Sequence, residues 1–139
     1  MKVEIINNQN LKRINLKSLH EKFDKLGFSL DIADKQISFY LCDNEFIKNL
    51  NKKYFKKNSP TDVISFPLKD DLEPDYLGEV VVSVETAIMV SKDLNIKWQK
   101  ELFLYLIHGV LHLIGYDDTT KIKRAVMEKK QEELLEEVY

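Results

Sequence analysis

Residues 108–118 read HGVLHLIGYDD, and this stretch constrains how the other helices and strands are arranged. On a helix, His108 and His112 lie about one turn apart along the axis and about 40° apart around it. Gly115 can end that helix by adopting a positive φ, and Asp118 follows at a point where the chain can fold back toward the histidines. Two imidazoles and a carboxylate in this order are typical of a site for one divalent metal ion with open positions for water and substrate.

The helix that carries the two histidines is predicted over residues 97–114. Apolar residues cover nearly every face of its second half: Phe103, Leu104, Leu106, Ile107, Val110, Leu111, Leu113 and Ile114. A helix that is apolar all round is buried in the interior of a protein. We therefore expect this helix to lie at the centre of the fold, with the metal site at its end.

Four strands and four further helices are predicted around that central helix. Strands are expected over residues 3–6, 36–41, 63–66 and 77–84. Helices are expected over residues 11–26 with Gly27 as the stop, from the cap Asp43 to about Tyr54, over residues 85–94, and from Thr119 or Thr120 to Val138. The near-continuous valines of residues 77–84 indicate a strand buried on both faces. This order predicts an α+β fold, a small mixed four-stranded sheet with about five helices.

The composition is that of an ordinary single domain over residues 1–139. The chain is 44% hydrophobic and 32% charged, and its formal net charge of −2 does not indicate a general nucleic-acid binder, so contact with a polyanion needs a local patch. The single cysteine, Cys42, excludes an intramolecular disulfide. No stretch reaches the ~18 apolar residues of a membrane span, and Met1–Ile6 is too short and charged for a signal peptide. We expect a cytoplasmic protein with no membrane partner.

The spacing of the histidine run also matches the ligand spacing of metzincin-like zinc proteases. Those enzymes carry a glutamate directly after the first histidine as the base that activates the metal-bound water, and this chain has Gly109 there. Protease chemistry is therefore disfavoured. Two alternatives stay open: a hydrogen-bonded pair of histidines without a metal, and an exchange of roles in which Asp118 caps the last helix while Asp117 is the ligand.

A second segment, residues 51–67, combines positive charge with aromatic side chains. Its four lysines are Lys52, Lys53, Lys56 and Lys57, with two aromatic residues between the pairs. Such a segment can follow a phosphate backbone while an aromatic ring offers a stacking face. The alternative is a solvated helix end whose lysines make no specific contact. Thr61 and Asp62, at the start of the following strand, either contact substrate or form a turn.

Together the two segments resemble the YbeY family, bacterial endoribonucleases that act as rRNA maturation factors. The family pattern appears here at residues 51–55, 61–67, 78–80 and 108–118, in the same order and at the same spacing. The resemblance implies a single-strand-specific, metal-dependent endoribonuclease, a hydrolase acting in rRNA 3′-end maturation and ribosome quality control. Its partners would be single-stranded RNA or rRNA and the ribosome or small-subunit proteins.

The resemblance also assigns site residues. The three metal-ligand and catalytic histidines of the family map to His108, His112 and Asp118, so the third is a departure. A zinc ion is expected, and a carboxylate ligand makes Mn²⁺ or Ni²⁺ an alternative. Phe55 stands where the family has an arginine thought to engage RNA, so Lys56 or Lys57 would have to substitute for it. The substrate-binding residues are then Lys52, Lys53, Lys56, Lys57, Thr61 and Ser65.

Two questions stay open at this point. The general base can be Asp62, Glu79 or Asp117, and the sequence does not choose between them. The two departures from the family pattern leave an alternative function, a metal-stabilised, ribosome-associated RNA-binding factor with weak or no nuclease activity. The oligomeric state is not predicted.

Overall fold

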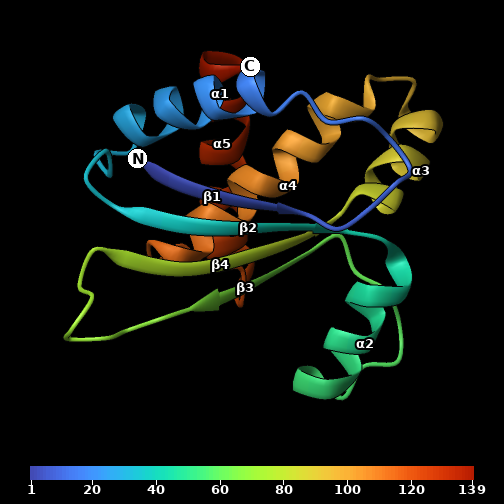
Figure 1. The fold of residues 1–139 in the computed structure, drawn as a ribbon, viewed down its shortest axis with the longest axis horizontal. Coiled ribbons are helices and arrows are strands. Elements are labelled where there is room, and N and C mark those ends of the chain that lie inside the picture. Colours follow the sequence, from blue (N-terminus) through green and yellow to red (C-terminus); the bar gives the residue numbers. More distant parts are fainter.

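The computed structural model describes residues 1–139, with four strands and five helices in the order β1–α1–β2–α2–β3–β4–α3–α4–α5 (Figure 1). The strands are β1 (Lys2–Asn7), β2 (Gln36–Cys42), β3 (Val63–Pro67) and β4 (Tyr76–Ser83). The helices are α1 (Leu16–Ser29), α2 (Asn44–Phe55), α3 (Val84–Leu94), α4 (Trp98–Leu113) and α5 (Lys121–Val138). The predicted α+β fold with a four-stranded mixed sheet and five helices is confirmed.

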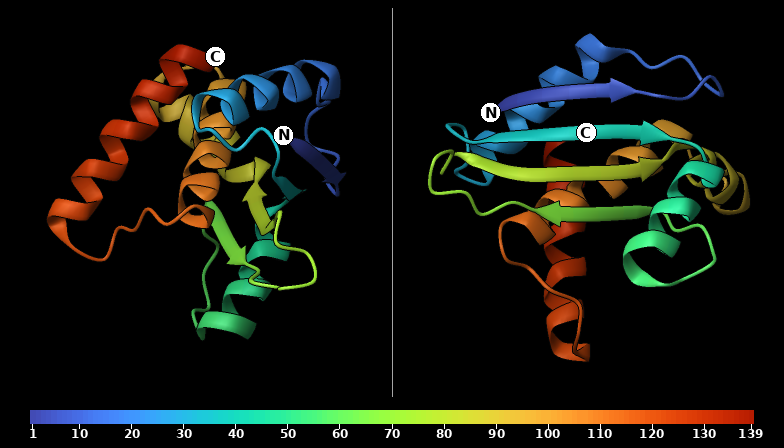
Figure 2. Two further views of the ribbon diagram at one scale, coloured as in Figure 1. Left: turned by 90° about the vertical axis from the view of Figure 1, so that its left-hand side faces the viewer. Right: turned by 60° about the horizontal axis from the view of Figure 1, so that its bottom comes forward.

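The sheet has the strand order β1-β2-β4-β3 (Figure 2). Strands β1, β2 and β4 are parallel, whereas β3 pairs antiparallel with β4 and forms one edge of the sheet. Val80, Val81 and Val82 of β4 are all buried, which confirms the expected burial of this strand on both faces. The free edge of β3 is therefore the place where other parts of the chain, or a ligand, can approach the sheet.

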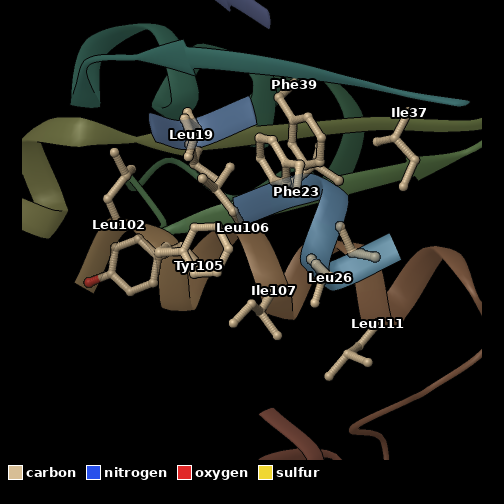
Figure 3. Packing of buried hydrophobic residues seen from close by; sticks show 14 of the residues in the cluster. Leu19, Phe23, Leu26, Ile37, Phe39, Leu102, Tyr105, Leu106, Ile107 and Leu111 are labelled. Atoms are coloured by element: carbon tan, nitrogen blue, oxygen red, sulfur yellow. The ribbon is translucent and has the colours of Figure 1, made fainter. Parts of the chain in front are cut away.

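Helices cover the two faces of the sheet unequally. The main core lies between one face and helices α1, α4 and α5, where the rings of Phe23 (α1) and Phe39 (β2) stack with centroids 4.2 Å apart (Figure 3). On the other face, α2 packs through Ile47 against Ile64 and Val81 in a smaller cluster. Helices α1 and α2 thus lie on opposite faces of the sheet.

Helix α4 is the central helix that the sequence predicts. Leu106, Ile107, Val110 and Leu111 are fully buried, and the helix packs against α3, α5, β3 and β4. Because it packs against four other elements, its direction is fixed, and its C-terminal end reaches the edge of the sheet beside β3 (Figure 2). None of the helices is long and apolar enough to cross a membrane.

The prediction for the first helix was wrong at both ends. Helix α1 begins at Leu16 because the Asn15 side chain accepts a hydrogen bond from the backbone N–H of Ser18 at 3.0 Å. It continues through Gly27 to Ser29. Gly27 is buried inside the helix, where an added Cβ would collide with Met1. The glycine therefore makes room for the start of β1 and does not stop the helix.

Candidate metal centre

The chain reverses direction directly after α4 and so returns Asp118 to the two histidines. Gly115 has a φ of +109°, its N–H donates to the carbonyl oxygen of His112 at 3.2 Å, and the N–H of Tyr116 donates to that of Leu111 at 2.9 Å. These two bonds are those of a Schellman motif, which terminates a helix through a residue of positive φ. The predicted role of Gly115 in ending the helix is confirmed.

Three potential ligand atoms converge at this turn. The Nε2 atoms of His108 and His112 are 3.1 Å apart, and Oδ2 of Asp118 lies 3.9 Å from the first and 3.6 Å from the second. The three side chains are partly exposed, at 27%, 28% and 45% of their surface. A substrate can therefore reach the group from solvent.

These separations fit a single metal ion. Ligand bonds of about 2.0–2.1 Å in a tetrahedral site place neighbouring ligand atoms about 3.3–3.4 Å apart. The observed separations of 3.1, 3.6 and 3.9 Å bracket that value. Two imidazole nitrogens and one carboxylate oxygen are also a donor set that zinc accepts, with a fourth position left for water or substrate. The group can hold a metal without a large movement of the backbone.

Gln131 on α5 orients the first histidine. Its Oε1 lies 2.8 Å from Nδ1 of His108, and because an amide oxygen can only accept, Nδ1 carries the proton. The lone pair of Nε2 is then directed toward His112 and Asp118. Hydrogen bonds of this kind fix the tautomer and the ring orientation of histidines that bind metals. Gln131 was not predicted from the sequence, because no local pattern relates it to a residue on α4.

Asp117 and Asp118 have different roles in the turn before α5. Asp117 accepts hydrogen bonds from the N–H of Thr119 at 2.6 Å and from its hydroxyl at 2.7 Å, and Lys123 lies 3.3 Å away. The Thr119 hydroxyl and N–H, together with Lys123, lower the pKa of Asp117 to about 2. Thr120 caps α5 through the N–H of Lys123. Asp118 is therefore the carboxylate that faces the histidines.

Gly109 follows the first histidine because α4 packs tightly against the sheet there. An added Cβ would collide with Val80 on β4 and would lie 3.2 Å from Oγ of Ser65 on β3. The hydroxyl of Ser65 donates to the carbonyl oxygen of Gly109 at 2.9 Å. The position thus has no room for the glutamate of a zinc protease.

A cleft of about 630 Å³ lies along the edge of β3 and includes the three converging side chains. Of the six residues predicted to bind substrate, Lys57, Thr61 and Ser65 line this cleft. The other three, Lys52, Lys53 and Lys56, are exposed near the end of α2 but are not part of its lining.

Asp62 is the predicted base that lies in the cleft. Its Oδ1 accepts a hydrogen bond from the N–H of Val63 at 2.9 Å and one from the hydroxyl of Thr61 at 3.2 Å, which leaves Oδ2 without an intramolecular partner. Glu79 is exposed on β4 and does not line the cleft. Geometry therefore favours Asp62 over Glu79 and over the hydrogen-bonded Asp117.

The sequence is similar to that of known proteins over nearly its whole length. The sequence model of the family described as Endoribonuclease YbeY matches residues 1–139. The chain belongs to the YbeY endoribonuclease family. A protein named Endoribonuclease YbeY from Syntrophus aciditrophicus is 36% identical over 140 residues, covering 96% of this chain and 88% of the relative. A protein with the same name from Persephonella marina is 36% identical over 132 residues, covering 91% of this chain and 86% of the relative.

A solved structure also resembles this YbeY-family chain over nearly its whole length. The solution structure of a protein from Thermotoga maritima superposes with a TM-score of 0.69 at 29% sequence identity, covering 98% of this chain and 88% of that one. The match includes the sheet, the central helix and the turn that follows it, because so little of either chain lies outside the superposition. The fold that carries the cleft is thus shared with that solved protein.

The two departures from the YbeY pattern both lie at the cleft. Asp118, in place of the expected histidine, brings its carboxylate to within 4 Å of both imidazoles. Phe55, in place of the expected arginine, lines the cleft, and so does Lys57 two residues further on. Lys56, the other proposed substitute for the arginine, is the left-handed C-cap of α2 and lies outside the lining.

Two further polar residues near the cleft, Asn51 of the family pattern and Glu101, were assigned no role from the sequence. Asn51 is buried, and its Nδ2 donates to the carbonyl oxygen of Ser59 at 2.9 Å, which holds the loop after α2 in place. Glu101 on α4 is 5% exposed, and its Oε2 has no hydrogen-bond partner. Burial, and then repulsion by Asp62, raise the pKa of Glu101. A single acid within a long apolar helix was the signal that could have identified it.

Proposed function

We propose that this chain is a metal-dependent endoribonuclease that hydrolyses phosphodiester bonds of single-stranded RNA. The observation that carries the proposal is the convergence of His108, His112 and Asp118 in a cleft that also contains Lys57. A ligand group for a divalent metal beside a cation suits a phosphodiester, whose charge must be neutralised during hydrolysis. Membership of the YbeY family supports RNA as the substrate.

The proposed metal is zinc, one ion per chain, with His108, His112 and Asp118 as ligands. When bound, the metal would polarise a phosphate oxygen and lower the pKa of a bound water. A carboxylate in place of a third imidazole lowers the net charge of the centre. It therefore makes a bound water less acidic and shifts the preference of the site toward harder ions such as Mn²⁺, with Ni²⁺ as a further alternative.

The protein residues of the cleft bind the RNA and move the proton. Lys57 would neutralise a phosphate. The hydroxyls of Thr61 and Ser65, which donate to Oδ1 of Asp62 and to the carbonyl oxygen of Gly109 in the free protein, would donate to the phosphate oxygens instead. Asp62 would accept the proton of the attacking water through Oδ2, which has no intramolecular partner. Lysines 52, 53 and 56, exposed at the end of α2, attract the flanking backbone.

The proposed biological role follows from the family. The substrate would be rRNA, cleaved during 3′-end maturation and ribosome quality control, and the partners would be the ribosome or proteins of its small subunit. This role places the protein in the cytoplasm, where ribosomes mature. The second candidate function is a metal-stabilised, ribosome-associated RNA-binding factor with little nuclease activity. Asp118 favours it, because a carboxylate ligand weakens the activation of a bound water.

Cleavage of an end-labelled single-stranded RNA tests the proposal. We expect His112→Ala to lose metal and to reduce the cleavage rate at least 100-fold, whereas His20→Ala, on the exposed surface of α1, retains both. Metal content is measured by elemental analysis of each purified variant. Ribosome co-sedimentation with negligible cleavage by the zinc-loaded wild type would instead support the binding factor. Cleavage by metal-free wild type at the same rate as by the zinc-loaded protein would rule out a role for the metal.

The two adjacent aspartates provide a matched pair for the third ligand. Asp118→Ala should lower the bound zinc to well below one ion per chain, because the ligand group then has only two members. Asp117→Ala removes hydrogen bonds to Thr119 but leaves all three ligands, so its zinc content should equal that of the wild type. A loss of zinc in Asp117→Ala alone would reverse the assignment of the two residues.

A further inference from the structure

The ring of Phe55 is the one aromatic side chain that lines the cleft with an exposed surface. Phe55 is the last residue of α2 and lines the cleft together with His108, His112 and Asp118. The residue is 48% exposed. The rest of the lining is mainly polar, and none of its other apolar residues has an aromatic ring: Val63 is half-buried, Ile64 is buried, and the other two are prolines. Exposure of an aromatic ring to water is unfavourable in free energy, and a ligand that covers the ring removes that cost.

The ring of Phe55 also packs against the aromatic ring of a residue on β3. Phe66 on β3 stacks against it with centroids 6.3 Å apart and planes at 26°. Tyr54 packs edge-on against the same Phe66 ring at 5.2 Å. Packing of this kind fixes the orientation of Phe55, so little conformational freedom is left to lose when a ligand binds. The rings of Tyr54 and Phe55 on α2 and of Phe66 on β3 connect the two elements.

We propose that Phe55 is the residue on which a base of the RNA stacks in this cleft. The base would lie on the exposed face of the ring, while an adjoining phosphate lies between Lys57 and the ligand group. Stacking on an aromatic side chain is tolerant of sequence, because every base offers a flat π-face. The inference rests on the proposed function, since it specifies how the RNA of that reaction is held.

This arrangement makes Phe55 a determinant of strand specificity. A base inside a duplex is already stacked on both sides, and to extrude it costs a few kcal/mol. Only an unpaired base presents a free face to the ring without that cost. The preference for single strands would therefore come in part from one side chain. Loss of the ring should raise KM for single-stranded RNA more than it lowers kcat, because Phe55 does not touch the reacting atoms.

The test measures how far binding depends on the bases of the RNA. In a His112→Ala background, which prevents cleavage, the affinity for a short single-stranded RNA is compared with that for an abasic analogue of the same length. Phe55→Leu keeps an apolar side chain but has no ring. We expect it to weaken binding of the intact RNA by about 5- to 150-fold and to leave binding of the abasic analogue unchanged. Phe55→Trp should restore the dependence on bases.

Phe28→Leu is the matched control. Phe28 is an exposed aromatic residue, at 84% exposure, on α1 at the opposite face of the sheet from α2, and it does not line the cleft. We expect this variant to keep the full difference between intact and abasic RNA. A 2-aminopurine base in the oligonucleotide gives an independent signal, since its fluorescence is quenched on stacking with Phe55 and should recover in Phe55→Leu.

The possible outcomes separate the stacking proposal from the proposed function. If neither oligonucleotide binds the zinc-loaded wild type or the His112→Ala parent, RNA is not the ligand of this cleft and both proposals fail. If the intact RNA binds and Phe55→Leu keeps the difference between the oligonucleotides, only the stacking assignment is overturned. An equal loss in Phe28→Leu also overturns it, because the effect would then not depend on the cleft.

Discussion

Gln131 is the residue whose contribution to the metal centre is most easily isolated. It contacts His108 through one hydrogen bond of 2.8 Å and lies on a different helix from both histidines. We expect Gln131→Leu to weaken zinc binding by about 10- to 100-fold, because the histidine ring is no longer held in one orientation and tautomer. Gln131→Glu retains an acceptor oxygen and should keep most of the affinity. Competition with a chromogenic chelator measures both, and equal zinc affinities for wild type and Gln131→Leu would contradict the positioning role.

Glu101 makes the stability of the protein depend on pH. Because burial raises the pKa of Glu101 in the folded protein, its protonated form stabilises the fold. That contribution is fully present below the unfolded pKa of about 4.3 and is lost as the pH rises through the folded pKa. We therefore expect Glu101→Gln to unfold at a higher urea concentration than wild type at pH 7, with the advantage vanishing below about pH 4. Glu21→Gln, on the exposed surface of α1, should show no difference at either pH.

At the scale of elements, the tight contact of α4 with the sheet depends on Gly109. A Cβ at this position would collide with Val80, and overpacking of a close-packed core costs about 1–3 kcal/mol of stability. We expect Gly109→Ala to lose that amount in urea denaturation. The double variant Gly109→Ala/Val80→Ala should lose less than the sum of the two single losses, because Val80→Ala opens space for the new methyl group. Strict additivity would show that the contact does not limit the packing.

The elements themselves were largely predictable from sequence because their signals are local. The valines of β4 and the all-round apolar surface of α4 report burial directly, whatever the partner. Gly27 shows where such reasoning fails. A glycine near the end of a helical stripe predicts a stop, but here it makes room for Met1, which lies far away in the sequence.

The same distinction applies to the candidate site. His108 and His112 are related by helical spacing, so the sequence places them together. Gln131 is 23 residues from His108, and the contact exists only because α5 packs back on α4. Phe55 and Lys57 reach the cleft, whereas Lys56 does not, because the chain adopts a left-handed conformation at that residue. Such differences between neighbouring residues depend on the three-dimensional path of the loop, which no local pattern encodes.

At the scale of the whole molecule, the net charge of −2 gives no general attraction for RNA. Any electrostatic attraction must therefore come from lysines near the cleft, and Lys57 is the one that lines it. Each phosphate contact with a single strand contributes about 0.7 to the slope of log K against log salt concentration. We expect Lys57→Ala to lower that slope by about 0.7, measured by fluorescence anisotropy between 50 and 200 mM salt. Lys25→Ala, on α1 at the opposite face of the sheet from α2, should leave the slope unchanged. Equal slopes for wild type and Lys57→Ala would mean that the RNA backbone does not enter the cleft at this lysine.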